Sequence, residues 1–160
     1  MKEERILVIV KPDAIVRGLI GEVFTRFERK GFKVIGTKMA KLGDVALDEH
    51  YSHIKDKPFF PGIKKFMTAA PVILVALSGV NASAAARLIA GQTAGDEADA
   101  GTIRGDLSMS VQSNVVHVSD SVEAGEEEVT RFFQESELFD YDRPDAHFVY
   151  SHVHRDFEAE

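Results

Sequence analysis

The distribution of apolar residues along the chain predicts strands and helices in alternation. Strand-length segments that are apolar or rich in β-branched residues are typical of buried strands, and they occupy residues 6–10, 32–41, 72–77 and 115–118. Apolar residues three and four positions apart indicate amphipathic helices, and this spacing occurs in residues 20–30, 45–54, 62–67, 82–89 and 122–133. The order of these segments predicts an α+β domain in which helices cover one face of a sheet of about four strands.

Individual residues mark the predicted ends of these elements. Gly31 and Gly91 are placed to end helices, because glycine tolerates the left-handed conformation that closes a helix. Side chains that cap the start of a helix are found at Asp44, Asn81 and Asp120. Gly36 lies inside the second predicted strand and indicates a bulge. Residues 91–113 are left as one long loop, and long ordered loops in compact domains are usually functional.

Length and composition narrow the class of protein. A chain of 160 residues fits a single domain, predicted over residues 1–150, followed by a polar tail at 151–160. The net charge of −7 speaks against a nucleic-acid-binding surface. The absence of cysteine excludes disulfides, thiol catalysis and thiolate zinc sites. The apolar runs are too short to cross a membrane, so we expect a soluble, cytoplasmic protein.

A histidine stands at the most informative junction of the chain. His117 follows the β-branched residues of the last predicted strand and precedes a predicted helix start at Asp120. Backbone N–H groups and the positive end of a helix dipole make such junctions good anion sites. His117 is therefore a candidate nucleophile for phosphate chemistry, although a single histidine near a strand end is more often structural.

Three cations lie at element ends or in the long loop. Lys11 follows the first strand, Arg87 lies in the alanine-rich helix, and Arg104 lies in the loop. Two guanidinium groups and an ammonium group suit a polyphosphate, although each of them also fits a surface ion pair. The chain has no Walker-type phosphate loop and no glycine-rich dinucleotide motif, so any nucleotide site must have another architecture.

At these residues the chain closely resembles the nucleoside diphosphate kinase family. The resemblance covers nearly the whole chain, from about Arg5 to Tyr150, and its motifs occur in the order and spacing of the family. The matching motifs are Lys11-Pro12-Asp13, Arg17-Gly18-Leu19-Ile20-Gly21-Glu22, Lys57-Pro58-Phe59-Phe60-Pro61-Gly62, Gly101-Thr102-Ile103-Arg104-Gly105-Asp106 and Asn114-x-x-His117-x-Ser119-Asp120-Ser121.

The resemblance implies both a fold and a reaction. The fold would be a ferredoxin-like βαββαβ sandwich with a four-stranded antiparallel sheet. The reaction would be ping-pong transfer of the γ-phosphate from a nucleoside triphosphate to a nucleoside diphosphate, through a phosphohistidine on His117. Glu128 would hydrogen-bond the other ring nitrogen, Ser119 would steady Glu128, and Lys11 would assist. Glu128 could otherwise be one carboxylate of a solvated helix face.

The same resemblance implies the substrate contacts and the partners. Mg²⁺ would bridge the nucleotide phosphates, and ATP, ADP, GTP, GDP and their deoxy forms would be substrates. A homo-oligomer is implied, with a hexamer favoured over a tetramer or dimer. The implied contacts to sugar, phosphates and base are Lys11, Tyr51, Phe59, Arg87, Thr93, Arg104, Val111 and Asn114. Each of these has an ordinary alternative as a core, rim, turn or loop residue.

One residue departs from the family pattern beside the nucleophile. Val118 stands where the family nearly always has glycine. If the backbone there had a positive φ, valine would strain the segment by roughly 1–2 kcal/mol; with a negative φ it would only add bulk. Val118 therefore motivates an alternative function, a non-catalytic nucleotide-binding or scaffold relative. A nucleic-acid-binding regulator is a third reading, which the acidic charge disfavours.

Overall fold

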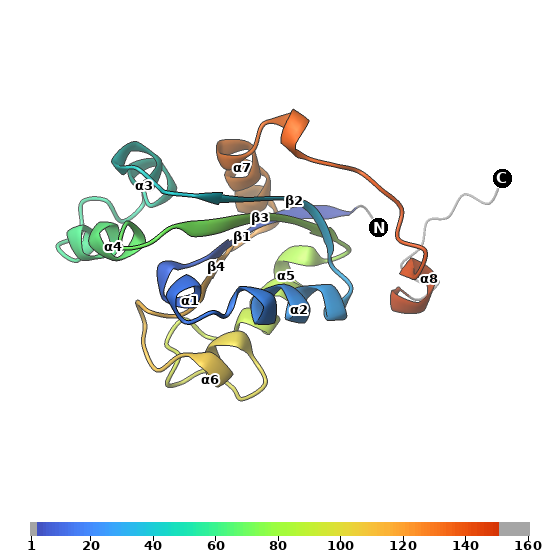
Figure 1. The fold of residues 1–160 in the computed structure, drawn as a ribbon, viewed down its shortest axis with the longest axis horizontal. Coiled ribbons are helices and arrows are strands. Elements are labelled where there is room, and N and C mark those ends of the chain that lie inside the picture. The colour runs from blue at the N-terminus through green and yellow to red at the C-terminus, as the bar shows by residue number, and fades with distance from the viewer. Residues whose placement is uncertain (1–2, 151–160) are drawn as a thin grey trace.

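The computed structural model describes residues 3–150, so the predicted tail at 151–160 lies outside the described residues. The described chain alternates strands and helices (Figure 1). In chain order the elements are β1 (Glu4–Val10), α1 (Pro12–Val16), α2 (Ile20–Lys30), β2 (Lys33–Ala40), α3 (Asp44–His50), α4 (Phe60–Met67), β3 (Val72–Gly79), α5 (Ala82–Ala90), α6 (Ile103–Leu107), β4 (Val116–Val118), α7 (Val122–Phe132), the 3₁₀ turn η1 (Glu135–Glu137) and α8 (Ala146–Val149).

The four strands form one antiparallel sheet. Their order is β2-β3-β1-β4, and β1 lies in the middle, paired with β3 and β4. The ladder between β2 and β3 shifts register between Val34 and Gly36, which confirms the predicted bulge. With α2 between β1 and β2 and α5 between β3 and β4, the chain has the predicted ferredoxin-like βαββαβ order.

Helices cover both faces of the sheet, so the prediction of a single covered face is wrong. Alternate residues of a strand point to opposite faces. In β1, Ile6, Val8 and Val10 join a core cluster with residues of α2 and α5, whereas Leu7 and Ile9 join a second cluster with residues of α3 and α7. Figure 1 shows α7 and α3 on one side of the sheet and α1, α2, α5 and α6 on the other. The unbroken apolar run of β1 follows from this double burial.

Four short elements were not predicted: helices α1, α6 and α8 and the 3₁₀ turn η1. Pro12 begins α1 instead of only ending β1, because the fixed φ of proline suits the first turn of a helix. The long loop contains α6, whose start is capped where Thr102 Oγ accepts a hydrogen bond from Gly105 N at 2.9 Å. Helices α1 and α6 have only five residues each, too few to show the regular spacing of apolar residues that indicates a helix.

The glycines predicted to end helices are confirmed, whereas the side chains predicted to cap helix starts are not. Gly31 and Gly91 follow α2 and α5 with φ of 111° and 81°, as expected for closing glycines. The predicted side-chain caps are wrong. Gly43 holds the cap position before Asp44, the Asn81 side chain makes no capping hydrogen bond, and α7 is capped by Ser121 instead of Asp120.

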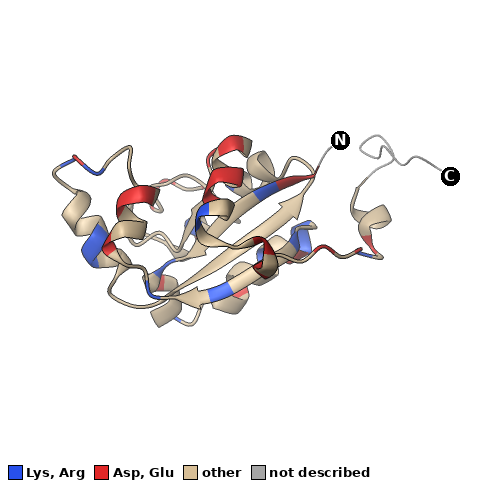
Figure 2. Cartoon of the chain, turned by 90° about the horizontal axis from the view of Figure 1, so that it is seen from above, with Lys and Arg blue, Asp and Glu red and all other residues tan. Residues whose placement is uncertain are grey.

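Charged residues lie mainly on the helices and connections, and the strands are mostly uncharged (Figure 2). This pattern is that of a sheet buried on both faces. Among residues 3–150, no helix combines the length and the apolar character that a membrane span requires.

Candidate functional site

A cavity of about 450 Å³ opens at the end of β1 where the chain turns into α1. Residues of α4, α5, α6 and β4 line it, together with Lys11 directly after β1. Nine residues that the sequence singled out line this cavity: Lys11, Tyr51, Phe59, Arg87, Thr93, Arg104, Val111, Asn114 and His117. Their functional roles remain predictions, but they share one surface.

His117 is held by a carboxylate behind it. In β4, Val116 and Val118 are buried against the α2 and α5 side, so His117 points to the face that carries α7. His117 Nε2 lies 3.0 Å from Glu128 Oε2 on α7. Because a carboxylate only accepts, Nε2 carries the ring proton and Nδ1 keeps its lone pair. The ring nitrogen with a free lone pair is therefore Nδ1.

Ser119 completes this chain of hydrogen bonds. Its hydroxyl donates to Glu128 Oε2 at 2.6 Å and accepts from Leu7 N at 2.9 Å. Burial raises the pKa of Glu128, but the hydrogen bond and charge of His117 and the bond from Ser119 outweigh it, so the pKa is lowered. Glu128 thus stays ionised at neutral pH and can stabilise positive charge on the imidazole.

A glycine allows α7 to approach the sheet. Gly125 packs so close to β1 that a Cβ atom there would lie 2.3 Å from the carbonyl oxygen of Arg5. No other residue fits such a contact with backbone without a shift. The close approach brings Glu128, one turn further along α7, into hydrogen-bonding range of His117.

Backbone strain beside His117 falls on Val115, not on Val118. Val115 has a φ of 73°, which costs a β-branched residue about 1–3 kcal/mol. Three hydrogen bonds hold it: its N–H donates to Asp13 Oδ2, its carbonyl accepts from Lys11 N, and Val116 N donates across it to Asn114 O. Val118 is not among the described residues that have a positive φ, and its side chain is buried in the core with 4% exposed. Valine is therefore unstrained at this position.

Lys11 and Arg104 form the cationic floor of the cavity. Lys11 Nζ donates to Asn114 Oδ1 at 2.6 Å, and Asn114 Nδ2 donates to the carbonyl of Thr93 at 2.9 Å. Burial, followed by the charge of Arg104, lowers the pKa of Lys11 to about 8. Arg104 is 8% exposed and donates to the carbonyls of Gly91, Asn114 and Val116. Burial, followed by the charge of Arg87, lowers its pKa to about 10.

The remaining predicted residues lie around the rim. Arg87 pairs with Asp120, so Asp120 holds a cation instead of capping α7. Burial, followed by the charge of Glu128, raises the pKa of Tyr51 to about 12, so its hydroxyl stays protonated as a donor. Phe59 and Val111 are 56% and 60% exposed, and thus offer two apolar side chains to a flat ligand.

Sequence reasoning missed His50, which packs on His117. The rings of His50 and His117 lie 4.5 Å apart between centroids in an edge-to-face arrangement. His50 Nδ1 lies 3.9 Å from Glu128 Oε1 and 3.4 Å from a guanidinium nitrogen of Arg131. Burial, followed by the charge of His117, lowers the pKa of His50 to about 3, so it is neutral. The available signal was its spacing of three residues from Leu47 on the buried side of α3.

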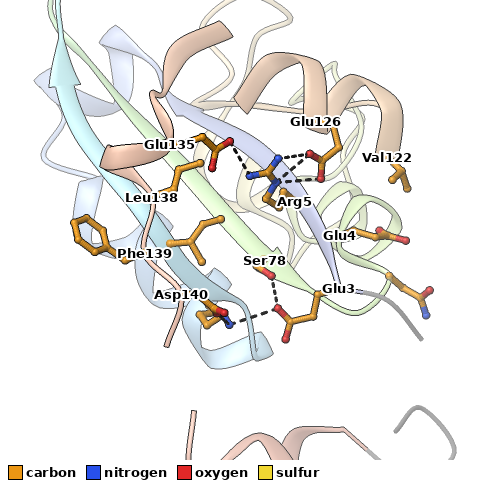
Figure 3. Close-up of a pocket in the computed structure, with 13 residues that line it drawn as sticks. Glu3, Glu4, Arg5, Ser78, Val122, Glu126, Glu135, Leu138, Phe139 and Asp140 are labelled. Atoms are coloured by element: carbon orange, nitrogen blue, oxygen red, sulfur yellow. Dashed lines mark hydrogen bonds and ion pairs between the residues drawn. The ribbon is translucent and has the colours of Figure 1, made fainter. Parts of the chain in front are cut away.

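A larger hollow of about 890 Å³ lies at the other end of β1 (Figure 3). Its cations are matched with carboxylates: Arg5 bonds Glu126 at 2.5 Å, and Lys33 lies 3.0 Å from Asp140. Among residues 3–150, its lining contains no histidine and no cation without a carboxylate partner. This chemistry does not suit a polyphosphate, in contrast to the smaller cavity around His117.

Comparisons with known proteins agree with this geometry. A sequence model of the family described as "Nucleoside diphosphate kinase" matches residues 4–138. A nucleoside diphosphate kinase of Parabacteroides distasonis is 54% identical over 139 residues, covering 87% of this chain and 91% of that protein. Nucleoside diphosphate kinase A of Rattus norvegicus is 41% identical, covering 92% and 97%.

Solved structures give the same result. A halophilic nucleoside diphosphate kinase from Halobacterium salinarum, in complex with CDP, superposes with a TM-score of 0.91 at 40% identity, covering 94% of this chain and 100% of that one. A nucleoside diphosphate kinase family protein from Babesia bovis superposes with a TM-score of 0.88 at 37% identity, covering 92% and 99%. This chain, an enzyme of nucleotide phosphate transfer, belongs to the nucleoside diphosphate kinase family.

Proposed function

We propose that this enzyme exchanges γ-phosphates between nucleoside triphosphates and diphosphates through a phosphohistidine on His117. One observation carries the proposal: His117 Nε2 is occupied by Glu128 at 3.0 Å, which leaves Nδ1 as the free nitrogen of a residue that lines the cationic cavity. Neutral imidazole is a good nucleophile near pH 7. The non-catalytic alternative loses its support, because Val118 carries no strain and the relatives are named as kinases.

The two half-reactions balance in phosphorus and charge. The lone pair of His117 Nδ1 attacks the γ-phosphorus, the N–P bond forms, and the bond from the γ-phosphorus to the β–γ bridging oxygen breaks. The nucleoside diphosphate leaves with that electron pair. Glu128 stabilises the positive charge on the ring. A terminal phosphate oxygen of a second diphosphate then attacks the phosphorus and returns the electron pair to Nδ1.

Binding of the substrates follows from the residues around the cavity. Lys11 and Arg104 offer charge to the phosphates, assisted by Arg87 and by the Tyr51 and Thr93 side chains. Asn114 would bind the sugar, together with Lys11. Phe59 and Val111 would hold the base between two apolar surfaces, and stacking contacts of this kind discriminate little between bases. We therefore expect ATP, ADP, GTP, GDP and deoxy forms to be accepted.

The described residues are compatible with a Mg²⁺ ion that enters the cavity bound to the nucleotide phosphates. Asp120 is the carboxylate among the side chains that line the cavity, and it is engaged by Arg87. A site with so few protein oxygens cannot enclose Mg²⁺, but this ion commonly keeps its waters and binds substrate phosphates. When bound, it would neutralise charge on the transferring phosphate.

We also propose that the enzyme is a homo-oligomer, with a hexamer favoured, and that it is cytoplasmic. Large apolar side chains are exposed on the described surface, including Val16, Leu88 and Met109 at 78%, 77% and 84%. Apolar surface of this kind is often covered by a partner subunit. Native mass spectrometry of the full chain measures the subunit number, and a monomer would refute the proposed assembly.

Transfer of label tests the catalytic proposal. After incubation with γ-labelled ATP, we expect acid-labile, alkali-stable label on the wild-type chain and none on His117→Ala. His53→Ala, which removes an exposed histidine outside the cavity, is the matched control and should label normally. Addition of unlabelled GDP should discharge the label as GTP. Label that persists in His117→Ala, or that GDP does not discharge, refutes the mechanism.

A further inference from the structure

The residues behind the nucleophile form a cluster of metal-ligating side chains that the phosphate transfer does not use as such. His50, His117 and Glu128 each offer one ligand atom, and these atoms all lie within 4.8 Å of one another. The closest approaches are 3.0 Å between His117 Nε2 and Glu128 Oε2, and 3.9 Å between His50 Nδ1 and Glu128 Oε1. Ligand atoms around a tetrahedral zinc ion, about 2.0–2.2 Å from the metal, are separated by about 3.3–3.6 Å. The two closest approaches differ from that spacing by about 0.3 Å, and the remaining ligand atoms lie within 4.8 Å, so side-chain movement would have to close the site around a metal ion.

We propose that His50, His117 and Glu128 form a site for a transition-metal cation of the Zn²⁺ type, and that the bound cation blocks the nucleophilic nitrogen of His117. Two imidazoles and one carboxylate suit Zn²⁺, whereas Mg²⁺ prefers oxygen ligands. Three protein ligands leave a fourth position for water, as in open zinc sites. The site is thus chemically distinct from the Mg²⁺ that accompanies the nucleotide.

The protonation state of His50 suits this role. Arg131 can only donate, so its approach to His50 Nδ1 at 3.4 Å means that Nδ1 presents its lone pair toward Arg131 and Glu128. The ring proton then lies on Nε2, which is buried without a hydrogen-bond partner among the described residues. The lone pair of His50 is therefore on Nδ1, the ring nitrogen nearer to Glu128, and a metal ion bound there would take the place of the contact with Arg131.

Two of the three proposed ligand residues are partly exposed to solvent. The side chain of His50 is 1% exposed, but those of His117 and Glu128 are 17% and 12% exposed. His117 also lines the cavity. The Arg131 guanidinium opposes a second cation nearby, so we expect a regulatory affinity and not that of a permanent structural zinc.

Metal binding would switch the tautomer of His117. In the metal-free enzyme Nε2 carries the proton, because Glu128 accepts from it at 3.0 Å. A cation on Nε2 takes the lone pair of that nitrogen, and the proton moves through water to Nδ1, with no net release. Nδ1 then has no lone pair with which to attack phosphorus. This consequence rests on the proposed function, whereas the metal site itself does not.

Metal titration in the absence of nucleotide tests the proposed metal site separately from the proposed block of His117. Isothermal titration calorimetry of the full chain with ZnCl₂ should give one site per chain, and CoCl₂ should give the intense visible absorption of a tetrahedral Co²⁺ site. His50→Asn should weaken Zn²⁺ binding at least about tenfold, since even outer-sphere partners of a metal site are worth about 10–100-fold. Nitrogen-15 NMR of the histidine side chains should show the His117 proton moving from Nε2 to Nδ1 as Zn²⁺ is added.

Matched controls exclude other histidines. His53→Asn, and the double change His152→Asn with His154→Asn in the tail, should bind Zn²⁺ as the wild type does. If His50→Asn does not fold, Arg131→Gln tests the same position, because removal of the opposing charge should tighten Zn²⁺ binding. Binding that is unchanged in both His50→Asn and Arg131→Gln, or that is lost with the tail histidines, overturns the site.

Measurements of His117 phosphorylation then test only the proposed block by the bound metal. With Mg²⁺ in excess, preloaded Zn²⁺ should slow labelling of His117 by ATP, and EDTA followed by Mg²⁺ should restore it. Labelling at an unchanged rate overturns the block even if Zn²⁺ binds. Failure of the metal-free enzyme to label would refute the phosphohistidine, while the titration would still decide the metal site.

Discussion

The two ends of β1 carry the same kinds of charged residue in opposite arrangements. At the beginning of the strand, Arg5 and Lys33 line the larger hollow, and both face carboxylates within ion-pair distance. At its end, Lys11 and Arg104 line the smaller cavity, and among the described residues neither has a carboxylate at ion-pair distance. The pKa values of Lys11 and Arg104 are lowered, which means that each charge is costly until an anion arrives.

This contrast shows why cavity volume alone misidentifies the site. The larger hollow has about twice the volume, but its charges are already satisfied within the chain. The smaller cavity keeps cations for an incoming phosphate and places an imidazole with a free nitrogen beside them. Perturbed pKa values and unmatched charge mark functional sites better than size does.

The sharpest test of the comparison is to remove one lysine from each of the two cavities, Lys11 from the smaller and Lys33 of β2 from the larger. Lys11→Met should lower kcat/KM by about 10²–10³-fold, the usual loss when one preorganised group on a transferring charge is deleted. Lys33→Met, which deletes the lysine at the larger hollow, should leave kcat/KM within about twofold of wild type. A coupled assay of ADP phosphorylation by GTP measures both, and comparable losses in the two variants would contradict the assignment.

Two glutamates on α7 provide the second test. Glu128→Gln removes the charge that stabilises the His117 ring and should lower kcat by about 10²-fold. Glu126→Gln changes a residue two positions away, which bonds Arg5 at the other end of β1, and should have little effect on kcat. Stopped-flow measurement of phosphoenzyme formation separates this chemical step from product release. Normal phosphorylation of Glu128→Gln would show that the charge of Glu128 does not assist phosphate transfer.

The contact between α7 and β1 joins the two regions and can be tested through stability. Gly125→Ala would place a Cβ atom 2.3 Å from Arg5 O, and such overpacking costs about 1–3 kcal/mol in the free energy of unfolding. Gly21→Ala in α2 meets nothing within 4 Å and should stabilise the protein by about 0.5–1 kcal/mol. Urea denaturation measures both, and an unaffected Gly125→Ala would mean that α7 does not need this close approach.

The smallest expected effect is on pH dependence. With a pKa of about 8, Lys11 is charged below pH 8 and loses its proton above it. Binding of ADP requires the charged form, so affinity should be constant below pH 8 and fall by up to about tenfold per pH unit above it. Calorimetric ADP titrations from pH 6.5 to 9.5 measure this, and Lys11→Gln should remove the dependence. A wild-type affinity for ADP that does not change up to pH 9.5 would contradict the lowered pKa of Lys11 and its proposed role in binding phosphate.

The apolar pattern was sufficient to predict the strands and the longer helices. The runs of β1 and β3 are long, apolar and bounded by clear turn residues, so their places were correct within a few residues. The run of β1 also carried the information that both faces are covered, which the prediction of one covered face overlooked. Helices α1 and α6 escaped because five residues give no periodic signal.

The sequence motifs identified the residues that share the cavity, but the tertiary contacts among them could not be predicted from the local sequence. Lys11 lies 93 positions before Arg104 and 106 positions before His117, and only the fold brings it to the same cavity as these two residues. The packing of His50 on His117 and the strain at Val115 depend on tertiary contacts that no local pattern records. Matching of Arg5 with Glu126 is equally invisible along the chain, since these residues are 121 positions apart.

The most direct measurement is the position of the phosphate on the His117 ring. Phosphoenzyme prepared with ATP from chain labelled with nitrogen-15 in histidine can be examined by phosphorus and nitrogen NMR, which distinguish the two ring nitrogens. Because Nε2 faces Glu128 at 3.0 Å, we expect the phosphate on Nδ1. Phosphate on Nε2, or on a residue other than His117, would contradict the central claim.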